Sequence, residues 1–183
     1  GKIAIEPKYD MAYSFTDGLA LVSEGGREGF IDTDGNYVIK LTDKVDYASF
    51  SDGYALIRKG NKWGFIDKKG NIVIKPAFYG AADFKEGFAS IMEKVGDKYL
   101  SGYINKKGKM ITKAIYEEVD DFQEGMACVK KNGKYGFINK KGKLVVNAIY
   151  DNAFSYENGL AYVAKGSNAY FIDKTGKKVI TIK

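Results

Sequence analysis

The feature that most constrains this chain of 183 residues is a four-residue anchor that recurs about every 35 residues. The anchor consists of glycine, an aromatic residue, isoleucine, and aspartate or asparagine. It reads GFID at Gly29 and Gly64, GYIN at Gly102, GFIN at Gly136 and YFID at Tyr170. A repeat of this length is one supersecondary unit that becomes stable by packing on its neighbours. The spacing therefore predicts a single repeat domain over residues 1–183.

A second pattern keeps the same spacing and fixes the repeat boundaries. It is an aromatic residue, any residue, an acid or amide, and glycine, written FTDG, FSDG, FKEG, FQEG and YENG. Together the patterns define repeats 1 to 5, which cover residues 9–43, 44–77, 78–115, 116–149 and 150–183. The opening GKIAIEPKYD matches GNIVIKPAFY at Gly70, so residues 1–8 are expected to form a partial N-terminal repeat that copies one strand.

Each repeat predicts three extended segments and almost no helix. The first, such as GLALVS at Gly18, has alanine in third place and is apolar on both faces, as expected for a strand buried on both sides. A two-residue turn signal such as NG at Asn132 leads to the second strand, which carries the anchor. A glycine-containing loop then leads to the third strand, such as IVIKP at Ile72. These signals indicate an all-β fold of tandem antiparallel β-meanders.

Two segments carry a family resemblance. KWGFIDKKGNIVIKPAF at Lys62 and KYGFINKKGKLVVNAIY at Lys134, each followed by the aromatic-x-acid-glycine pattern, resemble the WG repeat of bacterial proteins, also called the KWG repeat. The pattern covers essentially the whole chain. It departs mainly at the tryptophan, which survives only as Trp63; the other repeats have Glu28, Ser101, Tyr135 and Ala169 there. The resemblance implies tandem β repeats, often in surface or secreted bacterial proteins, with no general activity attached.

Two assemblies of the repeats are considered, and the sequence favours one of them. The favoured assembly is an open, twisted array or solenoid in which each repeat contacts only its neighbours. The alternative is a small β-propeller built from four-stranded blades. Counting KIAIE, the chain has six copies of the third strand, whereas a closed ring of five blades needs five. The anchor glycine is also replaced only in repeat 5, by Tyr170, as if that repeat lacked a neighbour that needs the space.

The anchors are expected to be structural. The glycines should allow the close approach of a neighbouring repeat, and the isoleucines share their strand face. The position of Trp63 varies so widely that it is expected near the surface. The structural anchors are Gly29, Gly64, Gly102, Gly136, Ile31, Ile66, Ile104, Ile138 and Ile172.

Catalytic and metal-binding residues are not expected. The chain has no histidine and a single cysteine, Cys128, which stands within a strand and is read as a packed thiol. The carboxylates at Glu117, Glu118, Asp120 and Asp121 lie in a connecting segment, so they are read as a solvated loop rather than a glycosidase pair. The stretch DTDG at Asp32 resembles the start of a calcium loop, but it lacks the later glutamate and is read as a turn. We therefore predict a protein that is not an enzyme and has no cofactor or metal.

Charge is the most suggestive functional feature. The chain has a net charge of +6, and lysines recur at one loop of successive repeats. These lysines are predicted to form a lysine ridge, a candidate basic binding surface, whereas acids gather at the aromatic-x-acid-glycine pattern and would leave the molecule electrically polarised. The favoured reading is that lysines at exposed turns serve solubility and block strand-to-strand aggregation. The lysine ridge comprises Lys68, Lys69, Lys106, Lys107, Lys140, Lys141 and Lys174.

Two functions are compatible with these residues. The first is a non-catalytic scaffold for protein–protein interaction or self-assembly, at a bacterial surface or secreted, with a cytoplasmic location as the alternative. The second is a glycan- or cell-wall-binding module that uses the lysine ridge and exposed aromatics, with an anionic glycan as ligand. Nucleic acid is not expected as a partner because the chain has few arginines to read bases and phosphates. No apolar run approaches the length of a transmembrane segment.

Overall fold

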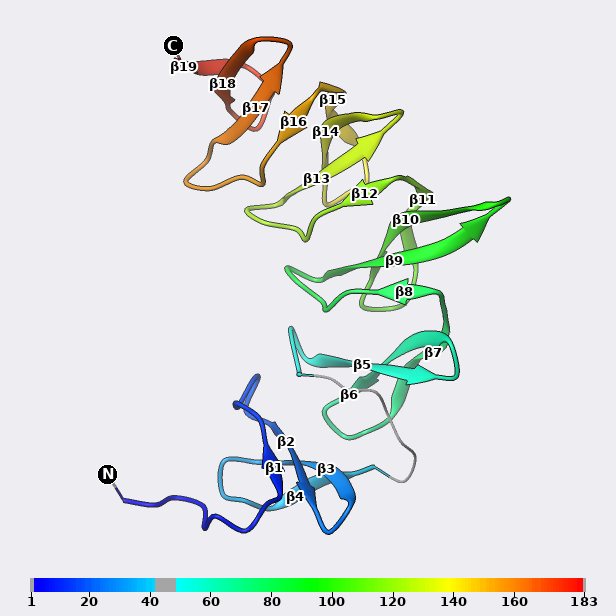
Figure 1. Cartoon of the computed structure of the whole chain (residues 1–183), viewed down its shortest axis with the longest axis vertical. Coiled ribbons are helices and arrows are strands. Elements are labelled where there is room, and N and C mark those ends of the chain that lie inside the picture. Colours follow the sequence, from blue (N-terminus) through cyan, green and yellow to red (C-terminus); the bar gives the residue numbers. More distant parts are fainter. Residues whose placement is uncertain (1, 42–48, 183) are drawn as a thin grey trace. The chain divides into compact units, whose positions relative to one another are not determined.

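The computed structural model describes residues 2–41 and 49–182, and within them the chain is all-β (Figure 1). These residues contain no helix, and hence none long and apolar enough to cross a membrane. They form several small antiparallel sheets. The prediction of an all-β fold made of antiparallel meanders is confirmed. The boundary between repeats 1 and 2 lies outside the described residues.

The chain forms two compact units, Gly1–Phe84 and Lys85–Lys183. The prediction of one domain therefore stays a prediction. The strands of the first unit are β1 (Met11–Ala12), β2 (Ala20–Glu24), β3 (Arg27–Ile31), β4 (Tyr37–Lys40), β5 (Tyr54–Lys59), β6 (Lys62–Asp67), β7 (Ile72–Phe78) and β8 (Gly80–Ala81). Strands β1 to β4 follow each other in one sheet, and β5 to β7 in a second.

The second unit continues the same pattern. In it β9, β10 and β11 pair in sequence order, β12 to β15 make a four-stranded sheet, and β16 to β19 make another (Figure 1). The segment that was expected only to connect repeats contributes the short outer strand of these four-stranded sheets. The strands are β9 (Phe88–Val95), β10 (Lys98–Asn105), β11 (Met110–Tyr116), β12 (Glu118–Val119), β13 (Met126–Lys131), β14 (Lys134–Asn139), β15 (Leu144–Tyr150), β16 (Asn152–Ala153), β17 (Ala161–Lys165), β18 (Asn168–Ile172) and β19 (Lys178–Ile182).

The recurring alanine is explained by the register of the first two strands. In every repeat it lies directly opposite the anchor isoleucine, as Ala127 lies opposite Ile138 in β13 and β14. Both residues are buried, and such cross-strand pairs stabilise a sheet. The alanine leaves room on this face because a neighbouring element packs over it. The same pairs are Ala20–Ile31, Ala55–Ile66, Ala89–Ile104 and Ala161–Ile172.

The sheets of this chain bury two different faces where they pack on a following repeat. We call the face with the anchor aromatic the forward face, because it packs on the following repeat, and the opposite face, with the alanine and isoleucine, the backward face. In one core, forward residues Phe137 and Val146 of repeat 4 pack with backward residues Ala161, Val163 and Ile172 of repeat 5. Repeats 1 and 2 share a core built in the same way. Within each unit, the core therefore lies between successive sheets, which is why both faces of the first strand are apolar.

An aromatic ring from the following repeat covers the anchor ring in each of repeats 1 to 4. The aromatic of the aromatic-x-acid-glycine pattern lies edge-on to the anchor ring, as in Phe137–Tyr156, whose centroids are 4.9 Å apart. This is the favoured geometry for aromatic pairs. The other pairs, with centroids 4.7–5.1 Å apart, are Phe30–Phe50, Phe65–Phe84 and Tyr103–Phe122.

The anchor glycines are constrained from within their own sheet. A Cβ at Gly64 would lie 2.4 Å from the carbonyl oxygen of Ile74 in β7, where a β-bulge interrupts the pairing with β6. Bulges also lie opposite Gly102 and Gly136. The expected close approach of a neighbouring repeat is therefore wrong: the third strand of the same repeat fills the space. In repeat 5, Tyr170 occupies this position, and β18 and β19 pair residue by residue there.

Gly29 is tight for a related reason. Its pairing with β4 has no bulge at that point, yet a Cβ there would lie 2.5 Å from the carbonyl oxygen of Ile39. The close contact again belongs to the same sheet. Replacement of the glycine in repeat 5 consequently says nothing about a missing neighbour.

The N-terminal segment is not the extra strand that was expected. Residues 2–8 contain no strand, because the segment brings no second strand with which a third strand could pair. Ile5 nevertheless takes the position of a third-strand residue. Its Cγ2 lies 3.3 Å from the Cβ position of Gly35, as Val146 Cγ2 lies 3.4 Å from that of Gly176.

These two corrections remove the sequence arguments that favoured the open array over the propeller. The repeats themselves, built as small meanders that pack face to face, suit both assemblies. The choice between them stays a prediction.

Candidate functional site

The aromatic-x-acid-glycine turns tie neighbouring repeats together through their acids. The acid or amide has a left-handed backbone in all five repeats, with φ of 50–54° at Asp17, Asp52, Glu86, Glu124 and Asn158. This conformation costs a non-glycine residue about 1–2 kcal/mol. Carboxylates at three of these positions accept hydrogen bonds from the backbone N–H of the next turn: Asp17 from Gly53 at 2.6 Å, Glu86 from Gly125 at 2.8 Å, and Glu124 from Gly159 at 2.9 Å.

The lysine ridge meets these same acids. Lys140 lies 3.1 Å from the Glu86 carboxylate and Lys174 lies 3.2 Å from that of Glu124, while Lys68 donates a hydrogen bond to the backbone oxygen of Asp17. Each contact joins a loop to the turn of the preceding repeat. The expected separation into a basic ridge and an acidic edge is therefore wrong for these residues, because successive repeats are offset so that the two sets touch.

The remaining residues of the lysine ridge differ in how exposed they are to solvent. Lys69, Lys107 and Lys141 follow directly in the loops and are exposed, whereas Lys106 is half-buried. Exposed ion pairs contribute little to stability. The exposed ridge lysines are the part of the predicted basic surface that is open to an anionic partner.

The loop at Asp32 belongs to a turn that all five repeats share. Oδ1 of Asp32 accepts hydrogen bonds from the backbone N–H groups of Asp34 and Asn36, and these bonds lower the pKa of its carboxyl. The fourth anchor residue makes the same two bonds in the other repeats, as Asn139 does with Lys141 and Lys143. An amide serves as well as a carboxylate, so the aspartate or asparagine is selected for turn geometry. The geometry supports the interpretation as a turn.

The carboxylates of repeat 4 are held by specific partners and do not form a uniformly solvated loop. Glu118 lies in β12, where Lys130 lies 2.7 Å from its carboxylate and the Tyr135 hydroxyl donates to it at 2.6 Å. The hydrogen bond from Lys130 lowers the pKa of the Glu118 carboxyl. Glu117 accepts a hydrogen bond from the N–H of Gly133 at 2.9 Å. These contacts hold the outer strand and the hairpin turn in place.

The next two acids have partners of their own. The Ser155 hydroxyl donates to Asp120 at 3.2 Å, and burial raises the pKa of the Asp120 carboxyl. Asp121 lies 3.1 Å from the ammonium group of Lys85. Both acids thus connect elements of the second unit.

Cys128 is a core residue. It lies in β13 with 2% of its surface exposed, and it packs with Phe137 and Val146 on the forward face. Burial raises the pKa of its thiol to about 12. The thiol stays protonated at neutral pH. Because the thiolate is the nucleophilic form, this supports a packed thiol rather than a nucleophile.

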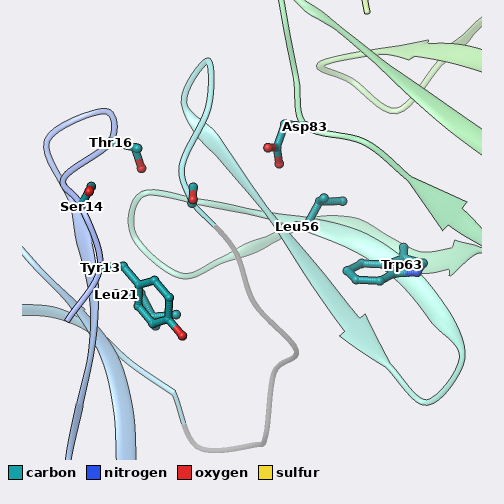
Figure 2. Close-up of a pocket in the computed structure, with 8 residues that line it drawn as sticks. Tyr13, Ser14, Thr16, Leu21, Leu56, Trp63 and Asp83 are labelled. Atoms are coloured by element: carbon teal, nitrogen blue, oxygen red, sulfur yellow. The ribbon is translucent and has the colours of Figure 1, made fainter. Parts of the chain in front are cut away.

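A hollow in the first unit gathers side chains that sequence reasoning did not combine. It has a volume of about 290 Å³ and includes the aromatic rings of Tyr13 and Trp63 (Figure 2). Tyr13 is 51% exposed, and Trp63 is half-buried in β6 with the Arg58 guanidinium 5.5 Å from its ring. The expectation that Trp63 lies near the surface agrees with this position. The remaining lining residues are Ser14, Thr16, Leu21, Ser49, Leu56 and Asp83.

The hollow combines aromatic faces with hydroxyl and carboxylate groups, which is the chemistry of a small polar ligand that carries an apolar face. Sequence signals could not reveal it. Tyr13 follows β1 in repeat 1 and Trp63 lies in β6 of repeat 2, and neither position keeps its residue type in the other repeats.

Comparisons with known proteins agree with the repeat architecture. The family model described as "WG containing repeat" matches residues 1–27, 29–63, 63–99, 102–135 and 135–168, and the chain belongs to this family. The matched segments begin and end within the sheets. The family model therefore places the start of each repeat at a different residue from the start of the meander. A search of curated proteins finds no match.

Solved structures share the fold at low sequence identity. The Hsv2p structure from Kluyveromyces lactis is 12% identical with a TM-score of 0.54, and the match covers 92% of this chain and 62% of that one. A eukaryotic initiation factor is 13% identical with a TM-score of 0.59, with 96% and 56% covered. Hsv2 from Kluyveromyces marxianus is 13% identical with a TM-score of 0.52, with 89% and 57% covered. These neighbours include Hsv2-like propellers, and this chain spans less than two thirds of their length.

Proposed function

We propose that this chain is a non-catalytic repeat scaffold that mediates protein–protein interaction or self-assembly at a bacterial surface. One observation carries the proposal: the side chains that recur in the repeats are used to hold sheets and turns together. The anchor aromatics pair with the following repeat, the turn acids accept its N–H groups, and the fourth anchor residues close loops. What remains for an outside partner is the variable surface, as in other repeat proteins.

Exposed apolar side chains offer such a partner a surface to contact. Phe154 is 59% exposed, Val179 54% and Ile180 49%, and all three lie in repeat 5. Large exposed apolar side chains that cluster in one region often mark interaction sites.

The interaction role is tested with a purified partner or with self-association. We expect binding to be lost in Ile180→Lys and retained in Ile115→Lys, a matched change at a 40% exposed isoleucine of β11. Hydrolysis of peptides or glycans by the pure protein, abolished in Glu118→Gln or Asp120→Asn, would overturn the non-catalytic part. The surface location is tested by protease treatment of intact cells, in which protection of the protein would contradict it.

The hollow beside Trp63 favours glycan binding as a second candidate function. Aromatic rings stack on the apolar faces of sugars, and the nearby Ser14, Thr16 and Asp83 can bind hydroxyl groups. The exposed ridge lysines would suit an anionic glycan.

Titration calorimetry with soluble cell-wall fragments tests this second candidate. Binding should weaken at least about tenfold in Trp63→Ala and in Tyr13→Ala. It should be unchanged in Tyr99→Ala, since this 52% exposed tyrosine lies outside the hollow. Equal binding by all three variants, or no binding by the wild type, would remove the glycan hypothesis.

A further inference from the structure

An asparagine–glycine bond forms the hairpin turn between β13 and β14. Asn132 and Gly133 are the two turn residues, and the pair Lys131–Lys134 closes the hairpin. Both turn residues have a left-handed backbone, with φ of 52° and 73°, as a tight hairpin turn requires. The side chain of Asn132 is exposed. The bond therefore faces water while the hairpin holds it in one turn conformation.

Asparagine followed by glycine loses its side-chain amide readily, because glycine has no side chain to shield its nitrogen. The Gly133 nitrogen gives up its proton and attacks Cγ of Asn132. The new N–Cγ bond forms, the bond from Cγ to the amide nitrogen breaks, and ammonia leaves with that proton. The product is a five-membered imide ring, which water opens at either carbonyl to give aspartate or isoaspartate.

Two features of the fold oppose this reaction while the hairpin is closed. Ring closure requires a backbone rotation at Asn132, which the two-residue turn prevents as long as its flanking strands stay paired. The Gly133 N–H also donates a hydrogen bond of 2.9 Å to Oε2 of Glu117. The negative charge of this carboxylate opposes the loss of the proton that it binds. The reaction therefore requires the turn to open.

The same contact between a carboxylate and a hairpin turn is present in repeats 1 and 5. Asp10 accepts a hydrogen bond from the Gly25 N–H and Asp151 accepts one from the Gly166 N–H, both at 2.7 Å. Like Glu117, each acid stands directly before the short outer strand of its sheet. In repeats 1 and 5 the first turn residue is glycine. Of these three turns, the contact falls on an asparagine–glycine bond only in repeat 4.

We propose that Asn132 is a site of spontaneous deamidation whose rate is set by Glu117. Glu117 is a positioning residue: it stabilises the closed turn, and loss of its hydrogen bond raises the population of the open turn in which the reaction proceeds. Isoaspartate adds a backbone carbon to a two-residue turn, and either product adds a negative charge close to Glu117. Deamidation therefore converts a transient opening of this hairpin into a permanent change of repeat 4.

Mass spectrometry of peptides from the full chain, kept folded in mildly alkaline buffer, tests the inference. The folded wild type should convert Asn132 slowly, and the chain unfolded in urea should convert it at least about tenfold faster, because the turn is lost. Folded Glu117→Ala should convert Asn132 about tenfold faster than the folded wild type, as expected for loss of a hydrogen bond to a charged group. Glu117→Gln should be intermediate, since its amide oxygen accepts the hydrogen bond without the charge.

Two controls separate this local effect from a general loss of stability. Asp10→Ala removes the equivalent contact in repeat 1 and should leave the rate at Asn132 unchanged. The second asparagine–glycine bond of the chain, Asn158–Gly159, is the internal control, because its glycine N–H donates to Glu124 at 2.9 Å. The rate at Asn158 should stay unchanged in Glu117→Ala and should rise in Glu124→Ala.

Three results would overturn the inference. The first is an equal rate at Asn132 in folded wild type and folded Glu117→Ala. The second is an equal acceleration at Asn132 and Asn158 in Glu117→Ala, which would indicate general unfolding. The third is an Asn132 that stays intact in folded Glu117→Ala over a time in which the unfolded chain converts fully.

Discussion

Repeats 4 and 5 have the same strands in the same order, but they differ on the forward face. Phe137 and Val146 are buried under repeat 5, whereas Phe171 is half-buried and Ile180 is 49% exposed. Gly136 lies opposite a bulge and Tyr170 in a regular ladder. Features common to both repeats, such as the alanine–isoleucine pair and the loop closed by Asn139 or Asp173, belong to the meander itself. The burial of the forward face differs because only repeat 4 packs on a following repeat. The pairing at Gly136 and Tyr170 differs because the third strand follows a different path.

The largest effect is expected at the anchor aromatics. Phe137→Ala should reduce the free energy of unfolding by about 4 kcal/mol, because a fully buried ring between two sheets is lost. Phe171→Ala should cost about 1 kcal/mol, since the ring is only partly buried in the folded chain. Urea unfolding of both variants measures the difference. Equal losses would show that the forward face of repeat 5 is as well covered as that of repeat 4.

The anchor glycine gives the next contrast. Gly136→Val should cost about 3 kcal/mol or more, because its Cβ would lie 2.5 Å from the carbonyl oxygen of Val146. Tyr170→Val keeps a side chain at a position that already holds one and should cost about 1–2 kcal/mol. Thermal melting of the pair checks the order. A Gly136→Val variant more stable than Tyr170→Val would contradict the close contact with the Val146 carbonyl.

These contrasts show what could be predicted from the sequence. The repeat spacing, the three strands and the tight turns follow from local patterns, and Asn132 and Gly133 have the positive φ that their turn signal requires. The cause of the glycine at Gly64 could not be predicted, because a bulge depends on how many residues the third strand inserts between its pairs. The contact between Lys140 and Glu86 could not be predicted, because it depends on how one repeat is displaced relative to the next, and the sequence of neither segment determines that displacement. The hollow at Tyr13 and Trp63 was missed for the same reason.

A smaller effect is expected at Trp63. Trp63→Ala should cost about 1 kcal/mol, since the ring is half-buried at a hollow and its contact with Arg58 lies near solvent. Gly64→Val, at the next residue, should be much more destabilising because of the nearby Ile74 carbonyl. Melting temperatures of the two variants provide the test. Equal temperatures would mean that the tryptophan carries the structural role assigned to the glycine.

The smallest effect concerns the turn acid of repeat 4. The hydrogen bond from the Gly159 N–H, together with Lys174, lowers the pKa of the Glu124 carboxyl in the folded chain. Its stabilising contribution is therefore present above the unfolded pKa, about 4.3, and is lost as pH falls through the folded pKa. Glu124→Gln should melt below the wild type at pH 7, and the gap should close as the pH falls below 4. A gap for Glu124→Gln that persists at low pH would contradict the linkage.

Native-state hydrogen exchange, at a concentration where the chain is monomeric, tests most directly the claim that each repeat is completed by the one that follows it. The amides of Phe137 and Ile138 in β14 are compared with those of Phe171 and Ile172 in β18. The account predicts slower exchange in β14, because opening it requires the loss of a covered forward face, whereas β18 opens without that loss. Equal protection of the two strands, or stronger protection of β18, would contradict the account.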